Sequence, residues 1–217
     1  MTMNILMLAY PGMTPLDLIG PLQAFSQLPD SNIQIAWKNT DPVMTDTGMA
    51  MVPTHRFSES FEAPDILFAP GGTKATFDLS KDEATLDFLR QKSANASWVT
   101  SVCTGAILLG AAGLLKGYKA TTHWAAMDYL SAYGAIPTKG RYVIDRNRVT
   151  GGGVTAGIDF GLALIAKIVS DEVAQTIQLA MEYSPQPPFK SGTPEEASPE
   201  ILQGVVTRFT ELLEAPS

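Results

Sequence analysis

The segment WVTSVCTGAILLGAAGLL, residues 98–115, joins an apolar, β-branched run directly to an Ala/Leu-rich helical pattern. Cys103 stands at the junction, and Gly105 follows two residues later. A strand that turns sharply into a helix is typical of a nucleophile elbow, here with Cys in place of Ser and without the first glycine of the G-x-S-x-G pattern. The free N–H groups at the start of a helix favour a thiolate, so we expect a nucleophilic Cys103 with a lowered pKa. The alternative is a small, buried hydrophobe, which free cysteines often are.

Short apolar runs alternate with helical patterns along the rest of the chain. The segments predicted as strands or strand ends are 4–10, 33–39, 65–72, 98–103, 118–124 and 143–153, and those predicted as helices are about 15–28, 80–94, 104–113, 124–133, 156–170 and 170–184. Several strands are apolar throughout, as in a mostly parallel sheet that helices cover on both faces. We therefore predict an α/β fold whose strand carboxyl ends form the rim that carries the site.

The end of the chain has a different composition. Residues 185–199, PQPPFKSGTPEEASP, are typical of turns and polyproline segments. A final helix is predicted at about 198–215, because Ser198 suits the N-cap, Pro199 suits the first helical position, and apolar residues recur at spacings of three and four. We expect a single domain over residues 1–217 whose C-terminal helix, after the Pro-rich connection, packs on the domain or on a partner subunit.

The composition excludes several kinds of partner. Among 217 residues, 15 Lys and Arg against 22 Asp and Glu give a net charge of −7 without a basic run, so we expect no nucleic-acid partner. Pro11 and Gly12 break the apolar stretch near the N-terminus before it reaches the length of a signal peptide or membrane span, which predicts a cytoplasmic protein with no membrane partner. One Cys with two His makes neither an internal disulfide nor a usual structural zinc site, and we expect no metal and no cofactor.

Two further segments place polar groups near a strand end and a helix start. FAPGG, residues 68–72, ends an apolar strand with two glycines, which let backbone N–H groups approach a reacting atom, although an ordinary turn has the same composition. TPLDLIGPLQAF, residues 14–25, puts Asp17 at a helix start, where it either caps the helix or acts as a catalytic carboxyl group. Gly20 and Pro21 are predicted to interrupt this helix after about one turn.

His123 ends the predicted strand YKATTH, 20 residues after Cys103. In a parallel sheet both residues reach the same rim, so a thiolate–imidazole pair is one interpretation, and a half-buried, hydrogen-bonded histidine is the other. GGGVTA, residues 151–156, matches the G-x-G-x-x-A dinucleotide pattern, but the helix after it is followed by another helix at Asp171 instead of a strand that ends in an acid. We therefore reject a dinucleotide site.

Five motifs, in this order, resemble the superfamily that contains the Parkinson's-disease-associated protein deglycase, the intracellular protease PfpI and the amidotransferase-like sensor domains of some transcription activators. The motifs are YPGMTPLDLIGPLQAF (10–25), LFAPGG (67–72), SVCTGAILLGAAGLLKG (101–117), KATTHW (119–124) and GGGVTAGIDFGL (151–162). The resemblance covers about residues 3–185. It implies a flavodoxin-like, three-layer α/β sandwich, usually a homodimer, with Cys103 as nucleophile and Asp17 as the carboxyl group that hydrogen-bonds it. Gly72 and Thr104 would offer backbone N–H groups to the bound group.

Within that superfamily, Asp17 combined with Cys103-Thr104-Gly105 is most similar to members that hydrate isonitriles. The resemblance implies a hydratase acting on a small-molecule substrate without a cofactor, with His123 as a further substrate-binding candidate. Two alternatives stay open: glyoxalase or deglycase chemistry on 2-oxoaldehydes, and a non-enzymatic sensor in which Cys103 is oxidised or binds a ligand. Ala125 stands where a glutaminase-type triad needs a carboxylate, so amidotransferase activity is not expected.

The protease-like members carry His where this chain has Thr104, and the deglycase-like members carry Glu where it has the shorter Asp17. These departures separate the chain from both groups and favour the hydratase interpretation.

Overall fold

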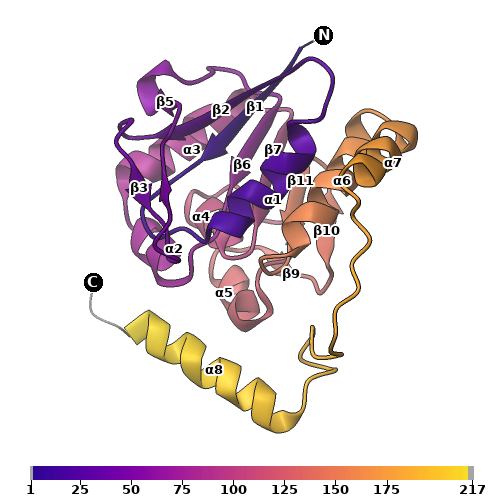
Figure 1. Cartoon of the computed structure of the whole chain (residues 1–217). Coiled ribbons are helices and arrows are strands. Elements are labelled where there is room, and N and C mark those ends of the chain that lie inside the picture. Colours follow the sequence, from indigo (N-terminus) through magenta and orange to yellow (C-terminus); the bar gives the residue numbers. More distant parts are fainter. Residues whose placement is uncertain (1, 215–217) are drawn as a thin grey trace.

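A mixed β-sheet forms the middle layer of the molecule in the computed structural model, which describes residues 2–214 (Figure 1). Its strands are β1 (Met3–Leu8), β2 (Ser31–Trp37), β5 (His55–Arg56), β6 (Ile66–Ala69), β7 (Trp98–Val102), β10 (Tyr142–Asp145) and β11 (Arg148–Gly151). They form a seven-stranded sheet in the order β10-β11-β7-β6-β1-β2-β5. Every pairing is parallel except that of β10 with β11, which confirms the predicted, mostly parallel sheet.

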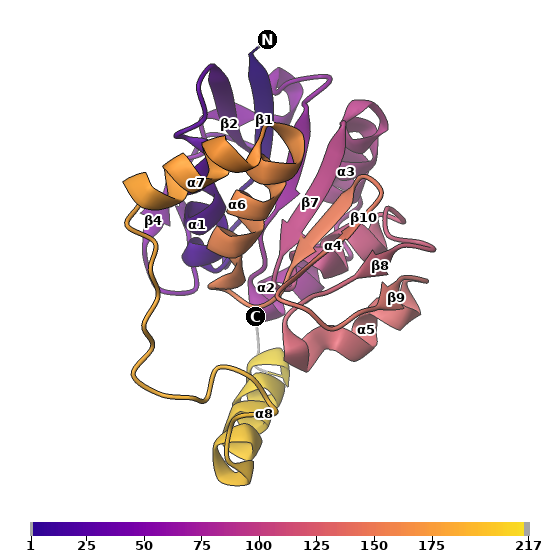
Figure 2. The ribbon, with the colours of Figure 1, turned by 90° about the vertical axis from the view of Figure 1, so that its right-hand side faces the viewer.

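Helices cover both faces of this sheet (Figure 2). One face carries α1 (Pro15–Phe25), α6 (Ala156–Ile168) and α7 (Asp171–Ala180); the other carries α2 (Thr73–Leu79), α3 (Glu83–Asn95), α4 (Gly105–Ala111) and α5 (Met127–Ala132). Shorter elements are β3 (Val43–Met44), β4 (Ala50–Met51), β8 (Lys119–Ala120), β9 (Ile136–Pro137) and the 3-10 turns η1 (Phe57–Glu59) and η2 (Trp124–Ala126). The arrangement confirms the predicted flavodoxin-like sandwich.

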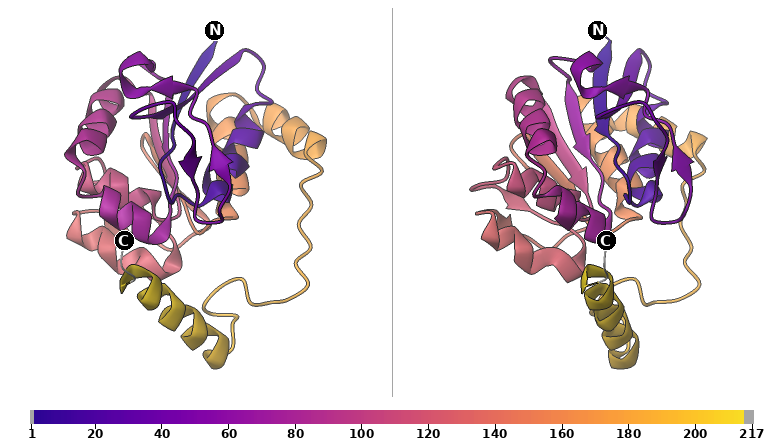
Figure 3. Two further views of the ribbon diagram at one scale, coloured as in Figure 1. Left: turned by 60° about the vertical axis from the view of Figure 1, so that its left-hand side comes forward. Right: turned by 90° about the vertical axis from the view of Figure 1, so that its left-hand side faces the viewer.

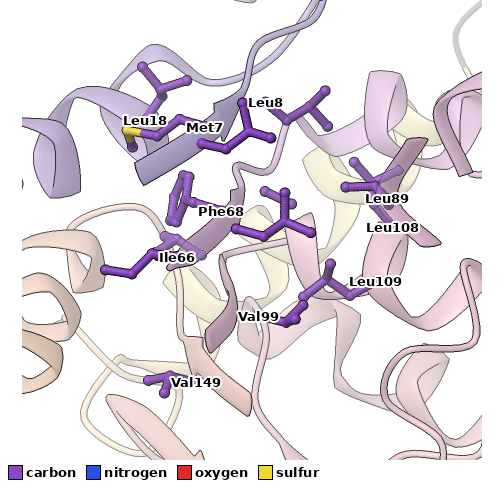
Figure 4. Close-up of a cluster of buried hydrophobic side chains, with 14 of the residues drawn as sticks. Met7, Leu8, Leu18, Ile66, Phe68, Leu89, Val99, Leu108, Leu109 and Val149 are labelled. Atoms are coloured by element: carbon purple, nitrogen blue, oxygen red, sulfur yellow. The ribbon is translucent and has the colours of Figure 1, made fainter. Parts of the chain in front are cut away.

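The central strands are apolar on both faces because each face meets a helix layer. Met7 and Leu8 of β1 and Phe68 of β6 are fully buried. Figure 4 shows Leu18 of α1 beside Met7 and Phe68, whereas Leu108 of α4 lies on the other side of the sheet. Burial of this kind stabilises by roughly 25 cal/mol per Å² of apolar surface removed from water. The buried layers hold the carboxyl ends of β6 and β7 at fixed positions.

The strand predicted at 118–124 is wrong as a member of the central sheet. Only Lys119 and Ala120 are extended, and they pair with β9 in a separate two-stranded sheet. The predicted segment 143–153 is also not one strand. Arg146 has a φ of 56°, and the chain turns back there, so that β10 runs antiparallel to β11. Local composition does not show such a reversal, because both halves have strand-forming residues.

The predicted interruption of the first helix is wrong, since α1 continues through Gly20 and Pro21 to Phe25. Both residues lie at the contact of α1 with α6. A Cβ added at Gly20 would meet Ile158 Cγ1 at 3.4 Å, and one added at Gly157 would meet Pro21 Cδ at 2.9 Å. Small residues therefore let the two helices approach closely, and we name this contact the α1–α6 seam.

A C-terminal helix, α8 (Pro199–Glu214), follows an extended connection and lies beyond the carboxyl edge of the sheet, near α2 (Figure 3). It confirms the predicted start; the predicted end at residue 215 and the predicted domain limits at 1 and 217 lie outside the described residues. None of its side chains is fully buried. Within residues 2–214, no helix combines the length and apolar character that crossing a membrane requires.

Candidate active site

Cys103 lies at the sharp turn between β7 and α4, with a φ of 56°. This left-handed conformation is uncommon for a residue other than glycine and is typical of a nucleophile elbow. Gly105 permits the turn, because a Cβ at that position would stand 2.1 Å from the carbonyl oxygen of Ala69. The predicted strand–turn–helix geometry is therefore present at Cys103.

The sulfur is buried, with Cys103 only 5% exposed. Burial raises the pKa of the thiol well above its ordinary value and the charge of Asp17 adds to the rise, whereas hydrogen bonds from the backbone N–H groups of Val154 and Thr104 lower it. The expected lowering of the thiol pKa is thus wrong for the free protein. Cys103 does stand beside a helix start, as predicted. The burial of the turn has the larger effect on the pKa of the thiol, and the local sequence does not show that burial.

Asp17 is fully buried beside this thiol. Its Oδ2 accepts a hydrogen bond from the Gly71 N–H at 3.0 Å, whereas Oδ1 has no partner in ordinary hydrogen-bond geometry among residues 2–214. Burial raises the pKa of Asp17 from 3.8 to about 7, against the lowering effects of the Cys103 thiol and the Gly71 N–H. Near neutral pH, the thiol therefore keeps its proton, and the carboxyl group is protonated in part of the molecules.

The carboxyl group of Asp17 does not cap its helix, so the capping interpretation is wrong. That group turns to Gly71, in the loop after β6, instead of to the N–H groups of its own helix. Thr14, at the N-cap, makes no capping bond either, and its hydroxyl donates to Asp46 at 2.5 Å. The first turn of α1 therefore directs its acid toward the elbow.

Gly72 and Thr104 are in contact beside the elbow, and the Gly72 N–H is already engaged. It donates to Thr104 Oγ1 at 3.1 Å. The neighbouring Gly71, which sequence reasoning passed over, contacts Asp17 instead, and a Cβ there would stand 2.6 Å from the Thr104 nitrogen and 2.7 Å from Asp17 Oδ2. Val154 was also missed, since an apolar residue gives no sign that its N–H faces a sulfur.

His123 is brought next to the elbow by loops instead of by a sheet strand. The hydroxyl of its neighbour Thr122 donates to the Cys103 carbonyl at 2.7 Å. Nδ1 of His123 accepts from the Ala125 N–H at 3.2 Å, and burial lowers the pKa of the imidazole, so the ring is neutral at pH 7. The ring stacks on Phe209 of α8, with centroids 5.9 Å apart and planes 5° from parallel.

Within the described chain, no group of three or more His, Cys, Asp or Glu side chains is placed to hold a metal ion. The glycine-rich segment at 151–156 leads from β11 into α6, which is followed by α7 instead of a strand. That order agrees with the rejection of a dinucleotide site.

The sheet is flavodoxin-like, a buried cysteine stands at the elbow after a central strand, and an acid from the first helix lies beside it. Together these features define a class of α/β proteins with a cysteine elbow. The chain belongs to the DJ-1/PfpI family, whose model matches residues 3–167.

Among its curated relatives, the isonitrile hydratase of Pseudomonas putida is 47% identical over 202 residues, which cover 93% of this chain and 88% of that protein. The HTH-type transcriptional regulator CdhR of Pseudomonas aeruginosa is 33% identical over 147 residues, or 67% of this chain and 41% of the regulator. The crystal structure of a THiJ/PfpI family protein from Pseudomonas syringae superposes with a TM-score of 0.96 at 46% identity, covering 99% of this chain and 88% of that one.

Proposed function

We propose that this protein is an isonitrile hydratase, which converts R–NC and water to the N-substituted formamide. The observation that carries the proposal is the buried pair of Cys103 and Asp17, with Asp17 held by Gly71 at the elbow. The 47% identity to a curated isonitrile hydratase over most of both chains supports it. A soft thiolate suits the electrophilic isonitrile carbon, and that carbon must also receive a proton.

In the first step, the sulfur of Cys103 attacks the terminal carbon while Asp17 delivers a proton to the same carbon. A C–S and a C–H bond form, the product is a thioimidate, R–N=CH–S–Cys, and Asp17 becomes a carboxylate. The reactive form of the pair is a thiolate with a protonated acid. This form arises when the proton of the Cys103 thiol moves to the Asp17 carboxylate. The raised pKa of Asp17, about 7, makes that carboxylate a better proton acceptor, and the N–H groups of Thr104 and Val154 stabilise the thiolate.

In the second step, water adds to the thioimidate carbon, and the nitrogen gains a proton. The C–S bond then breaks, the hydroxyl proton returns to the thiolate and carboxylate pair, and R–NH–CHO leaves. Water supplies both hydrogens and the oxygen that the formamide has gained, so the enzyme ends in its initial state. We propose that the Thr104 N–H and His123 contact the bound group. The Gly72 N–H can do so only after it leaves Thr104 Oγ1.

The test is parallel incubation of the protein with cyclohexyl isocyanide and with methylglyoxal, measuring formamide and lactate. We expect formamide as the main product. Lactate as the main product would replace the proposal by glyoxalase chemistry on the same thiol. Neither product would favour a sensor function, an idea that the similarity to a transcriptional regulator supports. Dialysis against EDTA serves as a further arm, and turnover lost there and restored by a metal would overturn the cofactor-free scheme.

We also propose a homodimer, because α8 has more apolar surface than its own chain covers. At 3.6 residues per turn, one continuous stripe contains Ile201, Leu202, Val205, Val206, Phe209, Leu212 and Leu213. Leu202, Phe209 and Leu213, in the middle, are half-buried, whereas Ile201 and Leu212 at one border are 52% and 43% exposed. A second copy would cover that border. Light scattering should give a dimer at micromolar concentration, and a monomer would contradict the proposal.

A single domain and a cytoplasmic location remain predictions from the sequence.

A further inference from the structure

Three buried hydroxyl groups connect the two ends of the glycine loop after β6. At one end, the Tyr10 hydroxyl donates to the Pro70 carbonyl at 3.0 Å. At the other end, the Gly72 N–H donates to Thr104 Oγ1 at 3.1 Å. Thr76 Oγ1 lies between them, 2.9 Å from both the Tyr10 and the Thr104 oxygens. We name this closed set the hydroxyl ring.

The hydrogen bonds of the hydroxyl ring run in a single direction. The Pro70 carbonyl only accepts, so it takes the single hydroxyl proton of Tyr10. Thr76 must then donate to Tyr10, and Thr104 must donate to Thr76, which leaves the Thr104 oxygen as the acceptor for the Gly72 N–H. Burial holds the pKa of Tyr10 well above its ordinary value, so the phenol keeps its proton throughout the neutral range. Tyr10, Thr76 and Thr104 are at most 1% exposed, and water does not compete for these bonds.

Between the two anchored ends stands Gly71, whose N–H donates to Asp17 Oδ2 at 3.0 Å. The loop is crowded as well as bonded, since a Cβ on Gly72 would lie 2.7 Å from the Gly12 carbonyl oxygen and 3.1 Å from the Tyr10 hydroxyl. We propose that Tyr10 and Thr76 are positioning residues of the active site, which hold the glycine loop so that the Gly71 N–H stays on Asp17. The expected effect of Tyr10 and Thr76 on turnover rests on the proposed function. Their expected effect on the titration of the Cys103 thiol does not.

Loss of the hydroxyl ring should change the pKa of Asp17 in a defined direction. The Gly71 hydrogen bond lowers the pKa of Asp17, so its loss raises that pKa further above the usual 3.8, beyond about 7. Cys103 and Asp46 also act on the pKa of Asp17, and the protonated Tyr10 interacts with its charge. On α6, which packs against α1, the acidic Asp159 turns away to Arg141.

The experiment compares variants that open the hydroxyl ring with variants that keep it. Tyr10→Phe and Thr76→Val remove a hydroxyl, whereas Thr76→Ser retains one. Thr100→Val is the matched control, because the Thr100 hydroxyl is equally buried and donates to the Leu67 carbonyl at 2.9 Å, outside the ring. Two quantities are measured: the pH dependence of Cys103 alkylation by iodoacetamide, and kcat and KM for hydration of cyclohexyl isocyanide.

We expect Tyr10→Phe and Thr76→Val to lower kcat by about 10-fold to 100-fold with little change in KM, since small displacements of reacting groups have effects of that size. The lower titration step in the alkylation profile should move to higher pH, because thiol and acid titrate as a pair. Thr76→Ser should resemble the unchanged protein. Thr100→Val should lower the melting temperature without moving either profile.

Wild-type kcat and alkylation profiles in folded Tyr10→Phe and Thr76→Val proteins would overturn the proposal. Equal shifts in Thr100→Val would also overturn it, by showing a general loss of stability. If Tyr10→Phe does not fold, the pair Thr76→Val and Thr76→Ser gives the answer. If the unchanged protein hydrates no isonitrile, the proposed function fails alone, and the alkylation profiles still test the hydroxyl ring.

Discussion

The elbow and the C-terminal helix differ in what holds their side chains. At the elbow, Cys103 and Asp17 are buried, and backbone N–H groups approach both of them. In α8 no side chain is fully buried, and the stack of Phe209 on His123 is its one aromatic contact in the described chain. Burial makes each polar partner costly to lose, because an unpaired buried group costs about 1–3 kcal/mol. Substitutions at the elbow should therefore change chemistry sharply, and substitutions in α8 should change it little.

The largest effect is expected for Cys103→Ala. The variant should have no hydration activity, since the scheme has no other nucleophile, and it should remain folded because the lost sulfur leaves a small cavity. The measurements are formamide production and thermal melting. Full activity in a folded alanine variant would remove the nucleophile from the scheme.

Asp17→Asn should lower turnover by about 10² to 10⁴-fold, the usual range for a positioned acid or base. The amide oxygen can still accept from the Gly71 N–H, but the side chain cannot supply a proton to the isonitrile carbon. Asp17→Glu keeps the proton and displaces it, so hydration should also fall. Steady-state formamide production is measured for both variants, with melting curves as the folding control. Unchanged turnover in a folded Asp17→Asn protein would leave Cys103 without its proposed partner.

Stability should fall between pH 4 and pH 7. Asp17 has a pKa raised from 3.8 to about 7 in the folded protein, so in this window the folded state binds more protons than the unfolded state. Its contribution is fully present below the unfolded value, decreases as the pH rises, and levels off above the folded value; its size is on the order of 4 kcal/mol. Urea unfolding at pH 5 and pH 8 measures it. Asp17→Asn should show a flatter dependence, and an equal slope in both proteins would contradict the assignment.

The smallest effect is expected for Phe209→Ala. A ring pair is worth about 0.5–1.5 kcal/mol, so its loss should loosen α8 and speed proteolysis of residues 185–198. Hydration should change by no more than about tenfold, the equivalent of 1.4 kcal/mol. Glu211→Ala, on the polar side of the same helix, is the control. A loss as large as that of Asp17→Asn would show that α8 belongs to the catalytic machinery.

The parts of this molecule that sequence predicts are those that local pattern specifies. The apolar run before Cys103 and the Ala/Leu pattern after it specify the elbow, and Ser198-Pro199 specifies the start of α8. The choice of Gly71 over Gly72 as the partner of Asp17 depends on the exact path of one loop. The hydrophobic periodicity of a sequence does not specify the path of a loop.

Contacts across long separations were likewise outside local pattern. Tyr10 and Thr76 meet across 66 residues, and only tertiary packing joins them. The raised pKa of the thiol follows from burial depth, which the segment around Cys103 does not show. The helix α2 was missed because its polar sequence, TKATFDL, lacks a clear apolar repeat.

The α1–α6 seam has a consequence for engineering. Asp17 stands in the first turn of α1, and Val154 lies just before α6, so the separation of these two helices sets the width of the space around the sulfur. A Cβ at Gly161 would meet the Ala24 Cβ at 3.2 Å, close enough to press the helices apart by a few tenths of an ångström. Graded side chains at position 161 would therefore widen the space around the sulfur in small steps, and each step would also carry Asp17 away from Cys103 together with α1.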